Sequence, residues 1–218
     1  DIDESFLNAS VTHAFGHLKK GETYVGPHRV DMAQQGQRRT TLVRETPLRI
    51  MYIGYKAPAF THPDWWPLML GMEYLTRGET SPLYQALADT HCATDADGPL
   101  YPTHDPYLAY FTIHGREHVS YDDIESAFMK CIHTVTHAPL TAKALLPYKE
   151  MLLAEEAKSR DGSRHIALTL SEYVASGDWR NYPRTFDAIL RVTPRDVLRA
   201  LKTYLVPHRS TIGTLHTP

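Results

Sequence analysis

The order of hydrophobic and polar residues predicts a chain in which helices and strands alternate. In residues 4–15 apolar side chains recur at helical spacing between Asp3, which can cap a helix, and Gly16, which can end one. The apolar stripe consists of Phe6, Leu7, Val11, Ala14 and Phe15. A stripe of this kind has to be buried, so we expect this helix to dock on another surface.

A polar segment without periodicity follows this helix. Residues 19–37 contain three glycines and one proline, a composition typical of a linker. The pattern therefore predicts three parts: a helix in residues 1–18, a linker in 19–37 and a main domain in 38–218.

Short runs rich in Thr, Val, Ile and Tyr predict the strands of the main domain. The runs are "RRTTLVRE", "PLRIMYIGYKAP", "PYLAYFTI" and, at the end of the chain, "RSTIGTL". The second run is the most apolar, and we expect it to be buried on both faces of the sheet. Residues 91–105 are rich in turn formers and do not favour one structure.

Helices are predicted between these strands by apolar spacing and by capping residues. Trp65, Leu68, Met69, Met72 and Leu75 form the inward stripe of one helix, and Gly78 is placed to end it. Three further helices have a cap at their start, namely Ser81 before Pro82, Ser120 with Asp123, and Thr193 before Pro194. Two more are expected in residues 141–160 and 163–176, the latter with Ile166, Leu170 and Tyr173 inward.

Composition removes several classes of function. The 218 residues carry 23 basic and 25 acidic side chains, and no basic patch that nucleic acid would need stands out. The most apolar stretches, "RIMYIGY" and "PLMLGM", are far shorter than the ~20 residues of a membrane span. The start, "DIDESF", has neither an initiator Met nor a signal peptide, which indicates a fragment or a processed chain. Cys92 and Cys131 form no C-x-x-C pattern and could either pair or stay reduced; we interpret them as two unpaired, semi-buried thiols.

One motif could carry chemistry: "HGREH", which matches the H-x-x-E-H pattern of a zinc peptidase. In such a site His114 and His118 would bind zinc from one helical turn, and Glu117 would activate a water. Here the motif follows a predicted strand, contains a glycine and precedes a helix cap, so a turn is favoured. A third ligand is also needed, and the downstream region offers only Asp196 inside a capped helix.

Other polar pairs have structural interpretations. His133 and His137 are four residues apart, without an acidic or thiolate partner at helical spacing, and are interpreted as a pair on a helix surface. Glu155 and Glu156 have basic neighbours at helical spacing, which favours a solvated helix face. The sequence contains neither a catalytic serine arrangement nor a phosphate-binding glycine loop.

The succession of segments nevertheless resembles a known family along almost the whole chain. The segments are "DIDESFLNASVTHAFGHLKKG", "HPDW", "SPLYQAL", "GDW" and the final "VTPRDV" block with its "YL". In order and spacing they are similar to the second, non-zinc half of the pitrilysin, insulinase and mitochondrial processing peptidase family. The resemblance implies a two-layer α+β domain, with a mostly antiparallel sheet covered by helices.

This resemblance also implies a function. The parent would be a zinc metalloendopeptidase of two halves closed around a chamber, with the zinc in a preceding N-terminal half. That half would be the partner of this chain, a peptide would be the substrate, and residues 1–18 would be the crossover helix between the halves. The chain itself would be an inactive peptidase-like domain without a cofactor. Bacterial relatives suggest a periplasmic parent, and a cytoplasmic parent is the alternative.

Active relatives often use an arginine and a tyrosine from this second half to hold the bound peptide. The corresponding positions here are Ala88 and Asp95, whose side chains cannot donate those hydrogen bonds at neutral pH. We therefore expect no catalytic residue in this chain. Two alternatives stay open: a structural subunit like the core proteins of a respiratory complex, and an autonomous zinc hydrolase using His114, Glu117 and His118.

Overall fold

The computed structural model of the protein describes residues 3–21, 32 and 34–217. The chain divides into two units, residues 1–33 and 34–218. In the first unit, helix α1 spans Glu4–Phe15, and the Asp3 carboxylate caps it by accepting a hydrogen bond from the Ser5 backbone N–H at 2.7 Å. None of the side chains of α1 is buried within this unit. Most of the predicted linker lies outside the described residues.

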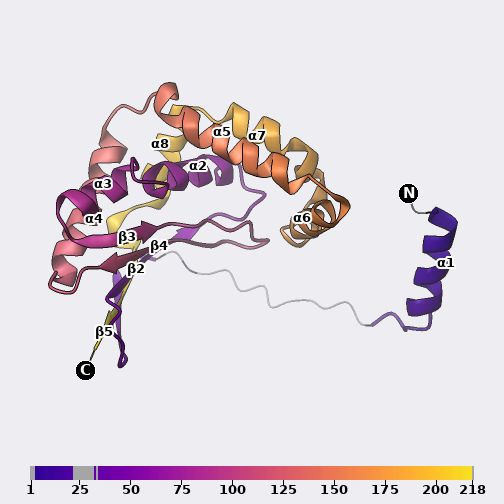
Figure 1. Ribbon diagram of the computed structural model, residues 1–218, viewed down its shortest axis with the longest axis horizontal. Coiled ribbons are helices and arrows are strands. Elements are labelled where there is room, and N and C mark those ends of the chain that lie inside the picture. The colour runs from indigo at the N-terminus through magenta and orange to yellow at the C-terminus, as the bar shows by residue number, and fades with distance from the viewer. Residues whose placement is uncertain (1–2, 22–31, 33, 218) are drawn as a thin grey trace. The chain divides into compact units, whose positions relative to one another are not determined.

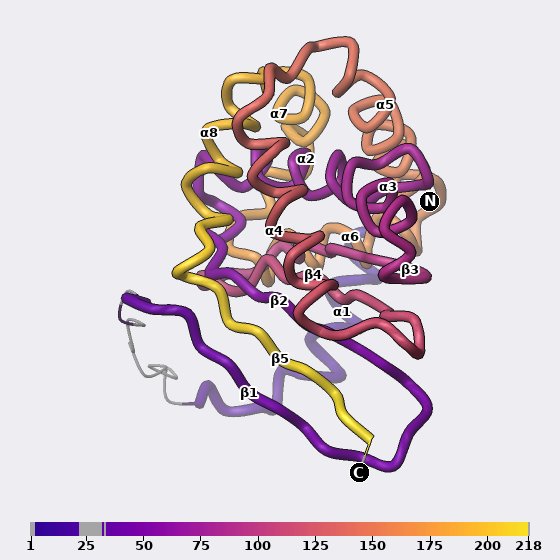
Figure 2. Tube along the Cα trace, turned by 90° about the vertical axis from the view of Figure 1, so that its left-hand side faces the viewer, coloured from indigo at the N-terminus to yellow at the C-terminus, as the bar shows by residue number. Residues whose placement is uncertain are grey.

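The second unit is built on a five-stranded sheet. The strands are β1 (Arg38–Val43), β2 (Ile50–Ala57), β3 (Ala93–Asp97), β4 (Tyr107–Gly115) and β5 (Thr211–His216). Their order is β1-β5-β2-β4-β3, and only the β1–β5 pair is parallel. Figure 2 shows the first and the last strand of this unit side by side. The prediction of a mostly antiparallel sheet is confirmed.

Helices form the second layer. They are α2 (Trp65–Thr76), α3 (Pro82–Asp89), α4 (Tyr121–His137), α5 (Ala142–Ser159), α6 (Ser163–Ala175), α7 (Thr185–Arg191) and α8 (Pro194–Tyr204), with short 3-10 helices at Trp179–Arg184 and Pro207–Arg209. In Figure 1, α2, α5, α7 and α8 lie on the same side of the sheet. The predicted caps at Ser81, Ser120 and Thr193 are all present, and Gly78 has the positive φ of 79° expected after a helix.

Only one face of the sheet is covered by this helical layer. The inward side chains of β2 and β4, among them Met51, Ile53, Phe111 and Ile113, have no exposed surface. Tyr52, which points to the other face, is 47% exposed. The prediction that this strand is buried on both faces is therefore wrong, because among the described residues the helices pack against one face alone.

The structure adds two elements that the sequence did not indicate and corrects one further expectation. Residues 91–105 contain β3, an edge strand whose sequence "ATDAD" carries no apolar alternation strong enough to reveal it. Residues 179–191 form a 3-10 helix followed by α7, which the sequence did not predict. Ile166 is 37% exposed rather than inward, because α6 buries only Tyr173.

The interpretation of the two glutamates in α5 as a solvated face is also wrong for one of them. The Glu156 side chain is only 13% exposed and pairs with Arg160 at 3.0 Å. Arg160 in turn lies over the rings of Tyr182 and Phe186. These rings belong to the segment after α6 that the sequence did not predict. The spacing of residues within α5 therefore could not reveal the burial of Glu156.

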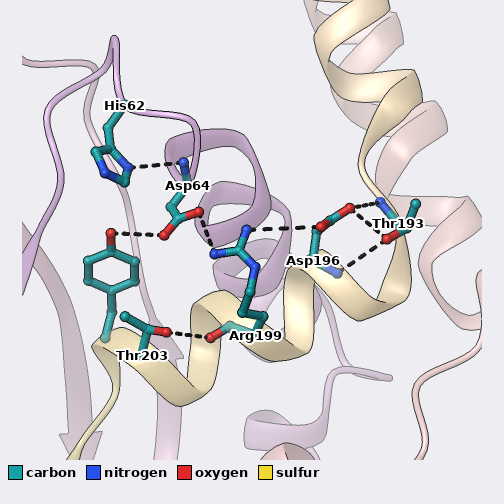
Figure 3. A network of polar contacts seen from close by, with 7 residues as sticks. His62, Asp64, Thr193, Asp196, Arg199 and Thr203 are labelled. Atoms are coloured by element: carbon teal, nitrogen blue, oxygen red, sulfur yellow. Dashed lines mark hydrogen bonds and ion pairs between the residues drawn. The ribbon is translucent and has the colours of Figure 1, made fainter.

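A buried carboxylate joins the start of α2 to α8. Figure 3 shows Asp64, immediately before α2, facing Arg199 of α8 at 2.6 Å. The same carboxylate accepts a hydrogen bond from the Tyr204 hydroxyl at 3.2 Å, and Asp64 is only 8% exposed. Burial and the neighbouring Asp64 carboxylate raise the pKa of Tyr204 to about 12, so its hydroxyl remains a donor at neutral pH. The arrangement holds the first turn of α2 against the last helix.

We predict that Asp64→Ala lowers the free energy of unfolding by about 1–3 kcal/mol, because Arg199 and the Tyr204 hydroxyl both lose their acceptor. Urea unfolding followed by circular dichroism measures this loss. Asp187→Ala is the matched control, because its pair with Arg191 spans 3.8 Å and both side chains are mostly exposed. We expect the control to change stability by less than about 0.5 kcal/mol. Equal effects of the two substitutions would show that the buried carboxylate has no special role.

Candidate functional site

The face of the sheet without helices displays a group of polar side chains. Strand pairing places Tyr52 of β2 opposite Thr112 of β4, and Thr112 opposite Asp97 of β3. Directly paired residues share a face. The same alternation brings Tyr110 and Asp95 to this uncovered face, which thus combines phenol, hydroxyl and carboxylate groups on a rigid support.

Tyrosines dominate one part of this face. Tyr52 is 47% exposed on this face, and Tyr101, which forms a hydrogen bond with Tyr110, is 52% exposed. Burial, followed by a hydrogen bond with Tyr101, raises the pKa of Tyr110. Its phenol therefore stays neutral at physiological pH and can exchange hydrogen bonds with an extended peptide backbone.

The two positions identified through the family resemblance lie together at one corner. Ala88 near the end of α3 and Asp95 on β3 line the same cavity of about 40 Å³. Ala88 is partly buried, whereas Asp95 is exposed. Arg116 lines the same cavity, and sequence reasoning passed over it because it stands inside "HGREH", where it was counted only as a spacer. Arg116 thus brings a guanidinium to this corner from the residue directly after β4, rather than from α3 or β3.

The "HGREH" residues have the strand and turn geometry that the sequence predicts. His114 lies on β4, paired with Asp95, and the strand ends at Gly115. Glu117 and His118 lie in the turn before α4. A Cβ at Gly115 would lie 2.6 Å from the terminal methyl of Ile124, so this strand end approaches α4 closely and a larger residue would require Ile124 to shift. His114 and His118 therefore do not share a helical turn.

The remaining candidate ligands have other partners. Asp196 forms the capping box of α8 together with Thr193. Hydrogen bonds from the Thr193 side chain and backbone lower the pKa of the Asp196 carboxyl. His133 and His137 stack on α4 with ring centroids 4.1 Å apart. Cys92 and Cys131 are free and buried, and burial raises the pKa of the Cys131 thiol to about 11. Within the described part of the chain, no three His, Cys, Asp or Glu side chains are grouped as metal ligands would be.

The fold and this geometry define a class of protein: a two-layer peptidase-like domain whose H-x-x-E-H residues do not form the helical zinc motif. The chain belongs to the family described as the peptidase M16 inactive domain, whose sequence model matches residues 1–152. This finding confirms the family resemblance recognised in the sequence. Among curated proteins, no sequence matches this chain significantly.

Solved structures show the same fold. A protease from Helicobacter pylori superposes with a TM-score of 0.90 at 20% identity, over 100% of this chain and 53% of that one. The inactive peptidase domain of a zinc-protease-like protein from Bordetella parapertussis has a TM-score of 0.73 at 25% identity, over 81% of this chain and 94% of the other. A chain of complex III from Candida albicans has a TM-score of 0.77 at 14% identity, over 99% of this chain and 53% of that one. This protein thus spans about half the length of the Helicobacter chain.

No helix in the described residues has both the length and the apolar character needed to cross a membrane.

We predict that the purified chain holds no stoichiometric zinc, because His114 lies on a strand and His118 in a turn. Elemental analysis of protein equilibrated with zinc and then desalted tests this expectation. About one zinc per chain, lost on His114→Ala but kept in the control His137→Ala, would contradict it.

Proposed function

We propose that this chain is the non-catalytic half of a two-half zinc metallopeptidase and forms one wall of its proteolytic chamber. The observation that carries the proposal is the uncovered sheet face of an M16 inactive domain, with its exposed tyrosines and carboxylates. One metal ion and one base are sufficient for peptide hydrolysis, so the opposite wall serves to bind the peptide and to exclude bulk water. Zinc, in this proposal, belongs to the preceding half of the parent protein.

Side chains at the edge of this face are suited to holding a peptide backbone. The Tyr110 phenol both donates and accepts hydrogen bonds, and Arg116 offers a guanidinium at the corner where Ala88 and Asp95 replace the donors of active relatives. Arg116 has no acidic partner among the residues that the structure describes. These groups would position the substrate without reacting with it.

Helix α1 supplies a surface for the zinc-bearing half. Phe6, Val11 and Phe15 are 69%, 49% and 61% exposed, and apolar surface of this extent is normally covered in an intact protein. A crossover helix between two halves would bury such side chains at their boundary. The parent would then depend on contacts of α1 as well as on the chamber wall.

A structural subunit of a respiratory-type complex is the second candidate, favoured by the fold shared with complex III of Candida albicans. At 14% identity the likeness concerns the fold alone. The two functions differ in whether adding this chain to its N-terminal partner generates peptidase activity.

We predict that the isolated chain does not cleave unstructured peptides, and that adding it to the separately expressed N-terminal half produces peptidase activity. Val11→Asp should weaken the activation roughly tenfold, because it places a charge in the apolar stripe of α1. Thr12→Asp, outside the apolar stripe of the same helix, is the matched control. Full activity of the first half alone, without association, would exclude the proposed role.

In the reconstituted pair, we expect Tyr110→Ala and Arg116→Ala each to raise KM by roughly threefold to tenfold while kcat changes little, because both groups bind the peptide away from the zinc. Steady-state kinetics with an unstructured peptide measure both constants. Arg195→Ala, in the helical layer, serves as the control and should leave KM unchanged. An unaltered KM in both variants would remove the uncovered face from substrate binding.

A further inference from the structure

The helical layer contains a cavity with aromatic walls, separate from the uncovered sheet face. Its volume is about 260 Å³, and α2, α5, α6 and α7 contribute to its lining. The aromatic walls are Phe60, Trp65, Trp66 and Tyr173. Their rings meet edge to face, with the Phe60 centroid 4.7 Å from that of Trp65 and 5.3 Å from that of Tyr173. This interlocked packing makes the walls rigid.

Three carboxylates line the same cavity, those of Glu155, Glu156 and Glu172. Arg77 pairs with Glu155 and Arg160 pairs with Glu156, but neither arginine lines the cavity. Glu172 has no cationic partner among the described residues. The cavity therefore presents negative charge beside aromatic rings, and both features attract a cation.

Helix α6 forms one wall of the cavity and contributes a single buried side chain to the core. Glycines in left-handed conformations bound it, Gly162 with φ of 82° and Gly177 with φ of 121°. The only buried side chain of α6 is Tyr173, whose hydroxyl lies 2.5 Å from the Thr185 hydroxyl. Thr169, Glu172 and Tyr173 of this helix face the cavity. Thr169 and Glu172 are not part of the buried core, so they can be replaced without removing a core side chain.

We propose that this cavity binds an ammonium group carried on an apolar stem. The aromatic walls would enclose the stem and attract the cation, and Glu172 would neutralise it at the α6 side. Two sources present this chemistry, a free aralkylamine and a lysine side chain of a polypeptide. The site lies in the helical layer, and the proposal does not depend on the chamber-wall function.

The test is isothermal titration of the chain with phenethylammonium chloride, with 2-phenylethanol as the neutral probe of similar shape. We expect saturable binding of the cation, at least about fivefold tighter than that of the alcohol. Glu172→Gln should weaken cation binding about fivefold, whereas the control Glu150→Gln, an exposed carboxylate of α5 outside the cavity, should leave it unchanged. Thr169→Phe, which fills the cavity, should abolish binding of both probes.

A parallel titration with an end-capped Gly-Lys-Gly peptide distinguishes the sources. Binding of the peptide alone points to a polypeptide ligand, and binding of the amine alone points to a small molecule. Either result supports the site if it responds to Glu172→Gln and Thr169→Phe. Three outcomes would overturn the proposal: equal affinity for the amine and the alcohol, binding that survives Thr169→Phe, or no binding of amine or peptide. Circular dichroism first establishes that each variant is folded.

Discussion

The burial of one sheet face only is the constraint on which the rest of this structure depends. Side chains alternate along β2 and β4, so each strand gives one set of residues to the core and another to the uncovered face. Met51, Ile53, Phe111 and Ile113 are completely buried on the first face. A register shift of one residue would exchange the two sets, so the core fixes which polar groups the other face displays.

Close packing between α2 and α8 determines how the helices lie on that buried face. A Cβ at Gly71 would lie 2.8 Å from a terminal methyl of Leu201, so the two helices approach closely here and a larger residue would require Leu201 to shift. Asp64 and Arg199 then fix the other end of the same contact by an ion pair. Steric fit determines how closely the helices approach, and the ion pair determines which turn of α8 faces the start of α2.

The sequence predicted well those elements whose signals are local. Caps at Asp3, Ser81, Ser120 and Thr193 depend on a side chain and the backbone next to it, and all four are present. The failures depend on distant partners instead. The "IMYIGY" run has enough apolar residues for two buried faces, but the number of covering layers is a property of the whole fold.

The candidate site was less predictable than the fold for the same reason. The turn at Glu117 and His118 followed from local signals, and the strand and turn geometry of the motif is as predicted. The proximity of Arg116 to Ala88 and Asp95 arises because β3 and β4 pair at the sheet edge, and β3 carries no clear strand pattern. Whether Ala88 and Asp95 face substrate stays a prediction.

The division between the two faces has a consequence for how such a domain can change without unfolding. Tyr52, Asp95 and Tyr110 lie outside the buried core, so replacing them costs little stability while it alters what the face can bind. The aromatic cavity is different, because Phe60, Trp65 and Tyr173 belong to the core itself. A substitution there alters binding and folding together. The cavity can therefore be tuned mainly through residues outside this core, such as Thr169 and Glu172 of α6.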